Sequence, residues 1–241
     1  MFDAHLHLPP PRRWAAAREA GIRGGVLAGL GPADWQTLEE AAASGLTWSA
    51  GLHPWWVHAA DDATLRDALR QLGQRLMSRG PVAIGECGLD FARARTSPAR
   101  SRQHRALEAQ LDMAREHEMP VVLHVVRATG AALGLVRDAA LPRGGLVHGF
   151  AGPREVAMDW HRIGFCVGIG PALHRSARLR AAVSLLPRTA LVVESDDADP
   201  AATLPGVVLA LAALRREDPD RVARYTAANA RRLFGLPGGK A

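Results

Sequence analysis

The sequence has only one lysine, Lys240, which lies in its Gly-Gly-Lys-Ala tail. This placement excludes a Schiff-base lysine on a strand of an active site. It also excludes a carbamylated lysine that bridges two metal ions. The net charge of +6 therefore comes almost wholly from arginine. Arginine suits phosphate-rich substrates, although an arginine-rich composition alone explains the charge equally well.

Cysteines and long apolar stretches are also scarce. Cys87 and Cys166 are the only cysteines, which is typical of a reducing compartment and not of a disulfide scaffold. No run of about 18 uncharged apolar residues occurs, so the sequence predicts no membrane span. The first motif follows Met1 almost directly, which leaves no room for a signal peptide. We expect a cytoplasmic protein that makes no membrane contact.

Short apolar runs recur along the whole chain, separated by segments of helical character. The length of 241 residues suits one (β/α)8 barrel, which typically has about 250 residues. Runs rich in Val, Ile or Leu are predicted as strands that are buried on both faces. These strands are Phe2–His7, Gly24–Ala28, Thr47–Leu52, Val82–Glu86, Val121–Val125, Gly145–His148, Phe165–Ile169 and Ala190–Glu194. Apolar spacings of three and four predict helices over Asp61–Arg79 and Pro98–His117.

Strands that alternate with helices predict a parallel sheet with right-handed crossovers. Eight such units make a closed (β/α)8 TIM barrel, in a single domain over residues 1–241. The second and sixth strands have the weakest pattern, so a seven-unit or distorted barrel is the alternative. Asp197–Leu204, rich in Asp, Ala and Pro, is predicted as a loop, and Pro237–Ala241 as a frayed end.

Two histidines open the set of candidate metal ligands. His5 and His7 are two residues apart in an extended segment, so their side chains point to the same face. Both can then bind one ion at the mouth of the barrel. The alternative is a pair of histidines that pack at a strand end.

Four further ligand candidates stand at the ends of apolar runs. Glu86 ends Val-Ala-Ile-Gly-Glu, where a buried carboxylate needs either a metal ion or an arginine partner. His124 and His148 end similar runs, and their alternative is a structural histidine. Asp196 follows the last strand, where it can bind metal and accept a proton from an attacking water.

Four imidazoles and two carboxylates exceed what one catalytic ion normally binds. We therefore predict two divalent ions about 3.5–4 Å apart. The mixed donor set suits Zn²⁺ or Mn²⁺, and Mg²⁺ where oxygen ligands dominate. We assign catalytic roles to Glu86, Asp196 and His53.

Neighbours of these residues are predicted to support them. His53, in Gly-Leu-His-Pro, is expected to contact the substrate or a bridging water, or to be structural. Asp3 and Glu194 lie next to ligands and are expected to orient a ligand imidazole or its backbone.

Substrate contacts are predicted at three positions. Arg127, three residues beyond His124, is placed to bind a phosphate, with a surface salt bridge as the alternative. Asp90 is expected to face the substrate and its attacking water, or to cap the next helix. Trp55, with Trp56, can stack on a base or sugar, or can cover the barrel.

Seven motifs carry these residues, in order, along nearly the whole chain. They read Asp3-Ala-His5-Leu-His7-Leu8, Gly51-Leu-His53-Pro54, Ala83-Ile-Gly-Glu86-Cys-Gly-Leu-Asp90-Phe91, Pro120-Val-Val-Leu-His124-Val-Val-Arg127-Ala128, Val147-His148-Gly-Phe150-Ala-Gly152, Glu194-Ser-Asp196 and Thr226-Ala-Ala-Asn229-Ala-Arg-Arg-Leu-Phe234. One motif alone is weakly specific, but the ordered set is highly specific. The set resembles the TatD-like family of metal-dependent deoxyribonucleases.

The resemblance implies a TIM barrel that holds two divalent ions and hydrolyses phosphodiester bonds, often from DNA 3′ ends. It implies six metal ligands, with Glu86 bridging the ions: His5, His7, Glu86, His124, His148 and Asp196. The chain departs from the family after Asp196, where an aromatic residue and an Asn-Pro pair are missing, and at Trp55, where the family often has a histidine.

We therefore expect a monomeric 3′–5′ exonuclease that acts on single-stranded DNA or on another phosphodiester. One alternative is a metal-dependent hydrolase of amide or ester bonds in small molecules, on the same scaffold. The other is a subunit that binds metal without enzymatic activity.

Overall fold

The computed structural model describes residues 1–42, 45–77 and 80–237. The end of the predicted helix Asp61–Arg79 and nearly all of the predicted frayed end Pro237–Ala241 lie outside these residues. A strand is present at each of the eight predicted places, and the strand order in the sheet is the chain order. The barrel therefore has eight (β/α) units and not seven, as the stronger of the two sequence interpretations predicts.

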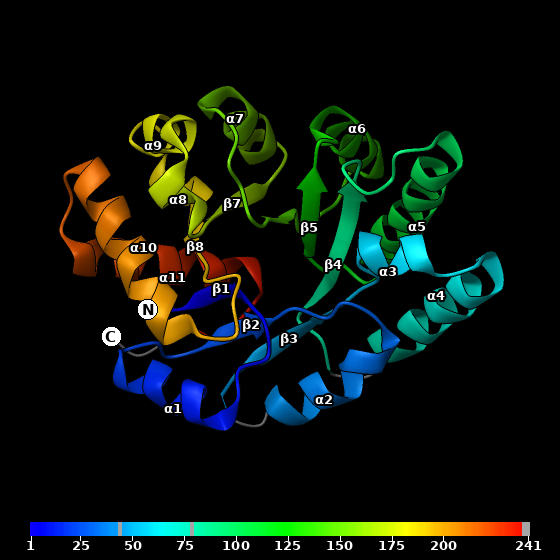
Figure 1. Ribbon diagram of the computed structural model, residues 1–241, viewed down its shortest axis with the longest axis horizontal. Helices are drawn as coiled ribbons and strands as arrows, with labels where there is room; N and C mark the ends of the chain where they lie inside the picture. The colour runs from blue at the N-terminus through cyan, green and yellow to red at the C-terminus, as the bar shows by residue number, and fades with distance from the viewer. Residues whose placement is uncertain (43–44, 78–79, 238–241) are drawn as a thin grey trace. The chain divides into compact units, whose positions relative to one another are not determined.

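The strands are short, as expected for a barrel of this type (Figure 1). They are β1 (Asp3–Leu6), β2 (Gly25–Leu27), β3 (Thr47–Ala50), β4 (Ala83–Asp90), β5 (Val121–Val126), β6 (Gly145–Val147), β7 (Phe165–Ile169) and β8 (Leu191–Val193). Their residues are almost all buried, which explains why the strands read as apolar runs without alternation.

Helices follow the strands along the chain. They are α1 (Pro11–Glu19), α2 (Pro32–Ala42), α3 (Pro54–Ala59), α4 (Asp62–Leu76), α5 (Ser97–Glu116), α6 (Thr129–Ala139), α7 (Arg154–Arg162), α8 (Ala172–Arg175), α9 (Ala177–Val183), the 3₁₀ helix η1 (Arg188–Ala190), α10 (Pro200–Arg215) and α11 (Pro219–Leu233). Among the described residues, no helix has the length and apolar character that crossing a membrane requires.

The chain packs as two compact units. Unit 1 comprises Met1–Leu27 and Leu146–Ala241, and unit 2 comprises Ala28–Gly145. The assignment of residues 1–241 to a single domain stays a prediction.

In unit 1, the last strand returns to the first. β1 pairs in parallel with β2, and β7 with β8. Beyond β8, the Asp196 N–H donates to the His5 carbonyl at 3.0 Å, and the His7 N–H donates to the Asp197 carbonyl at 3.2 Å. These bonds join both ends of the strand sequence, which is the closure that a barrel needs.

In unit 2, β4 lies between β3 and β5, and both pairs are parallel. β4 continues to Asp90, four residues past the predicted end at Glu86, because its pairing with β5 extends to Asp90 opposite Val126. Helix α5 packs on β4 (Figure 1). Its buried Gln103 accepts the Asp90 N–H at 2.9 Å, which holds the end of the strand.

The prediction of a loop over Asp197–Leu204 is wrong from Pro200 onward, because α10 begins there. The Asp199 side chain accepts the Ala202 N–H as the N-cap, and Pro200 occupies the first helical position. Asp and Pro are frequent in loops and equally frequent at helix starts. Leu204, which is fully buried, anchors the helix to the core.

Candidate metal centre

Three imidazoles surround one carboxylate in unit 1. We call this group the first cluster; it consists of His5, His7, His148 and Asp196. The Nε2 atoms of His5 and His7 each lie 3.5 Å from Asp196 Oδ1, and His148 Nδ1 lies 3.8 Å from the same oxygen. Two ligands at about 2.1 Å from a tetrahedral ion are about 3.4 Å apart. The spacing within the first cluster therefore fits a divalent cation.

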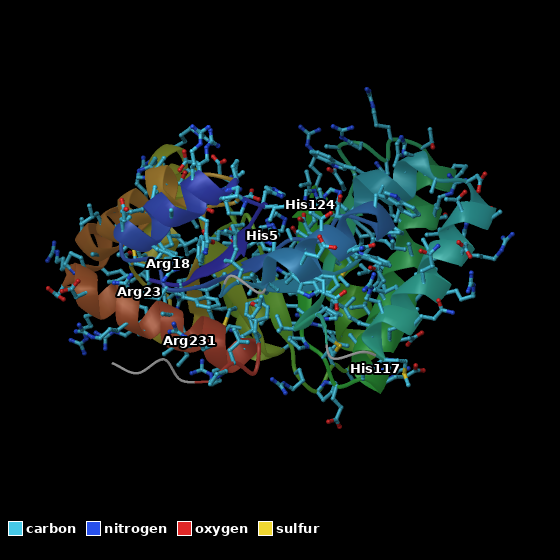
Figure 2. The ribbon with its side chains drawn as sticks, turned by 90° about the horizontal axis from the view of Figure 1, so that it is seen from below. His5, Arg18, Arg23, His117, His124 and Arg231 are labelled. Atoms are coloured by element: carbon cyan, nitrogen blue, oxygen red, sulfur yellow. The ribbon has the colours of Figure 1, made fainter. Side chains whose placement is uncertain are left out.

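Ring stacking and backbone hydrogen bonds hold these ligands in place. The imidazole rings of His5, labelled in Figure 2, and His148 stack with their centroids 4.1 Å apart. Buried Asp3 accepts the His5 N–H at 3.2 Å and the Ser195 N–H at 3.0 Å. Asp3 therefore ties β1 to the residue before Asp196. This contact supports a backbone-orienting role for Asp3, which stays a prediction.

Glu194 also contacts backbone beside the first cluster. Its carboxylate accepts the N–H of Gly149, the residue after His148. Burial raises the pKa of Glu194 to about 8 and the pKa of Asp3 to about 7, because it disfavours the charged form of each carboxyl group. Glu194 Oε2 has no hydrogen-bond partner among the described residues. A bound cation would favour the ionised form of both acids, so the electrostatics also fit a metal site.

Gly168 on β7 has no side chain, and the Glu194 carboxylate fills the space where one would lie. A Cβ atom at position 168 would collide with the carboxylate of Glu194, and that side chain is fully buried and cannot move into solvent. We expect Gly168→Ala to lower the free energy of unfolding by about 1–3 kcal/mol because it overpacks this site. Urea denaturation of the full chain measures the change.

Gly134→Ala is the matched control for this prediction. Gly134 lies within α6, and a Cβ atom there meets nothing within 4 Å. The change should raise the free energy of unfolding by about 0.5–1 kcal/mol, because alanine has less backbone entropy to lose. Equal unfolding midpoints for the two variants would contradict the packing argument.

Unit 2 holds a second group of candidate ligands. We call it the second cluster; it consists of His53, Glu86, Asp90 and His124. Glu86 Oε1 lies 3.0 Å from His53 Nε2 and 3.0 Å from His124 Nδ1. The carboxylate is buried, with 2% of the side chain exposed. Both of these contacts are with imidazoles, the residue type that shares a metal ion with a carboxylate.

The hydrogen bonds of His53 determine which of its nitrogens carries the hydrogen. His53 is the N-cap of α3, and its Nδ1 accepts the backbone N–H of Trp55 at 3.0 Å. A backbone N–H can only donate, so Nδ1 is the acceptor and the hydrogen sits on Nε2. Nε2 then donates to Glu86 and has no lone pair left for an ion. The geometry favours His53 as a hydrogen-bond donor over His53 as a metal ligand.

His124, labelled in Figure 2, has the opposite arrangement. Its Nε2 lies 3.2 Å from Asp90 Oδ2. An ionised carboxylate can only accept, so Asp90 Oδ2 accepts the Nε2–H of His124. In the neutral ring, the Nδ1 lone pair then faces Glu86 Oε1 at 3.0 Å. Two acceptors this close need a proton or a cation beside them. Ligands at right angles and about 2.1 Å from an ion are about 3.0 Å apart, so this pair fits a divalent cation.

Asp90 is occupied by contacts within the protein. Asp90 is only 3% exposed. Oδ2 accepts from Trp55 Nε1 at 2.6 Å and from His124, while Oδ1 accepts the N–H groups of Ala92 and Arg93. These contacts favour an orienting role for Asp90 at His124. The substrate contact assigned to Asp90 from the sequence stays a prediction.

Two arginines of unit 2 are available to a substrate. Arg127 is exposed, at a φ of 54°, and has no ion-pair partner among the described residues. Arg93, which sequence reasoning missed, places its guanidinium carbon 4.0 Å from the ring centroid of Trp55. Nothing in the sequence distinguishes Arg93 from its neighbour Arg95, because only the fold brings Arg93 over the indole.

Comparisons with known proteins agree with one another. The family model described as TatD related DNase matches residues 2–235. The chain is 35% identical over 246 residues to the 3'-5' ssDNA/RNA exonuclease TatD of Erwinia billingiae (strain Eb661), covering 92% of this chain and 91% of that protein. It is 30% identical over 262 residues to the uncharacterized metal-dependent hydrolase YjjV of Escherichia coli (strain K12), covering 98% of each. The crystal structure of that TatD homolog matches with a TM-score of 0.87 and 27% identity, over 98% of each chain.

Proposed function

Because the chain belongs to the TatD related DNase family, we propose that it is a divalent-metal-dependent phosphodiesterase that removes nucleotides from the 3′ end of single-stranded DNA. The observation that carries the proposal is the placement of the six predicted ligands. Each lies in the first or the second cluster, at spacings that fit a cation. The names of the relatives support the substrate class.

We propose one divalent ion for each cluster. His5, His7, His148 and Asp196 would hold one, and Glu86 and His124 the other. Bound ions would polarise the phosphodiester and make the attacking water more acidic. Bridging by Glu86, the choice among Zn²⁺, Mn²⁺ and Mg²⁺, the monomeric state and the cytoplasmic location stay predictions.

The protein side chains supply proton transfer and positioning. Asp196, whose side chain is 37% exposed, can receive a water molecule and accept its proton as the new bond to phosphorus forms. The bond from phosphorus to the leaving oxygen breaks, and that oxygen takes a proton from solvent. His53 would hold the Glu86 carboxylate in position through its Nε2–H, whose direction is fixed because Nδ1 accepts the Trp55 N–H. The substrate contact of His53 stays a prediction. Arg127 would bind a neighbouring phosphate.

The test is release of nucleotides from single-stranded DNA labelled at either end, with Mg²⁺, Mn²⁺ or Zn²⁺ and with EDTA. We expect stepwise release from the 3′ end that requires a metal ion. Glu86→Gln, purified in parallel, controls for contaminating nucleases. Hydrolysis of an amide or ester panel with no nucleotide release would contradict the proposal in favour of a small-molecule hydrolase. No turnover of any substrate, with stable co-purification of a partner, would favour the non-enzymatic subunit.

A further inference from the structure

Trp55 is an exposed aromatic side chain beside the second cluster. The chain has six tryptophans, all within the described residues, and Trp55 is the most exposed of them, at 46%. Its ring centroid lies 5.0 Å from that of His53 and 6.0 Å from that of His124. An exposed indole beside the cluster offers a flat aromatic face on which a nucleobase can stack.

The indole is held in place before any ligand arrives. Its Nε1 donates to buried Asp90 at 2.6 Å, and its backbone N–H donates to His53. A ring fixed in this way loses little conformational freedom when a partner stacks on it. Trp56, the alternative platform, is half-buried, and its indole fills the space beside Gly31.

Arg93 adds a cation to this platform. Its guanidinium carbon lies 4.0 Å from the centroid of the Trp55 ring, which is a cation–π contact. The side chain is exposed and has no ion-pair partner among the residues that the structure describes. A guanidinium stacked by its face keeps its N–H groups free in the plane, where they can bind a phosphate.

We infer that Trp55 and Arg93 form a nucleotide subsite, in which the indole stacks on an unpaired nucleobase and Arg93 binds an adjoining phosphate. The inference rests on the proposed function and deepens it. Stacking accepts any base, since every base has a π face, so the subsite gives affinity without sequence preference. Paired bases are already stacked within a duplex, so the subsite selects single-stranded ends.

The test measures binding without catalysis, on the full chain in EDTA. Fluorescence anisotropy of a labelled thymidylate oligomer is compared with that of a labelled abasic phosphodiester chain of equal length. We expect Trp55→Ala to bind the thymidylate oligomer roughly 5- to 150-fold more weakly, the range for one lost base stack. Affinity for the abasic chain should not change. In the wild type, thymidylate should also quench tryptophan fluorescence, and the abasic chain should not.

Two further variants separate stacking from charge. Trp55→Phe keeps an aromatic face and should keep most of the base-dependent affinity; a loss as large as that of Trp55→Ala would overturn the stacking role. Arg93→Gln should reduce the slope of log affinity against log salt by about 0.7, as expected for one lost contact with a single strand. Arg66→Gln, an exposed arginine on α4, is the matched control and should not change base-dependent affinity.

The outcomes distinguish the subsite from the proposed function. Wild-type affinity of Trp55→Ala for the thymidylate oligomer would overturn the subsite, even in an active exonuclease. Base-dependent binding in EDTA without metal-dependent hydrolysis would support the subsite and contradict the exonuclease.

Discussion

Glu86→Gln should lower metal-dependent hydrolysis by about a thousandfold or more, the scale of losing a group that acts directly at the reaction centre. The Glu86 carboxylate lies 3.0 Å from both His53 Nε2 and His124 Nδ1. Glutamine keeps the size and one oxygen acceptor but removes the negative charge that would hold a cation. Steady-state rates at saturating metal measure the loss of activity. Mass spectrometry of the native protein measures the loss of bound metal per chain.

Glu108→Gln is the matched control for this substitution. Glu108 is exposed on α5 in the same unit, so the same chemical change should leave both rate and metal content unaltered. Cooperative urea unfolding of Glu86→Gln would show that the fold persists. A wild-type rate for Glu86→Gln would contradict the assignment of this residue to the metal centre.

Asp196→Asn should lower the rate by about 100- to 1000-fold, because it removes both a charged ligand and the proposed proton acceptor. Asp196 adopts the left-handed backbone conformation, with a φ of 52°. Asparagine tolerates this conformation as well as aspartate does, whereas alanine would add strain. The loss can therefore be attributed to the carboxylate. Rates across pH, at saturating metal, provide the measurement.

Asp159→Asn makes the same change elsewhere in unit 1. Asp159 lies on α7 and pairs with Arg162 at 2.8 Å on the surface, and such pairs contribute little to stability. Its rate should equal that of the wild type. Asp196→Asn that retains wild-type activity and a full complement of metal would refute both roles of the carboxylate.

The barrel was predictable because its strands are buried on both faces. Burial forces each strand to be a short apolar run, and polar residues such as His124, two residues before the end of β5, then stand out. Even the weak strands β2 and β6 were recognisable, since three residues suffice for each. The start of α10 was not recognisable in the sequence, because Asp and Pro are frequent both in loops and at helix starts.

The fold class and the residue types that can bind a cation were readable from the sequence, because hydrophobic periodicity and donor chemistry are local properties. What each side chain can do depends on the folded packing. His53 becomes a donor because the start of α3 uses its Nδ1, and buried Asp90 contacts both Trp55 and His124 through one carboxylate oxygen. Arg93 gained its place over Trp55 in the same way. Such roles depend on which atoms meet across distant segments, and that is decided by packing and not by spacing along the chain.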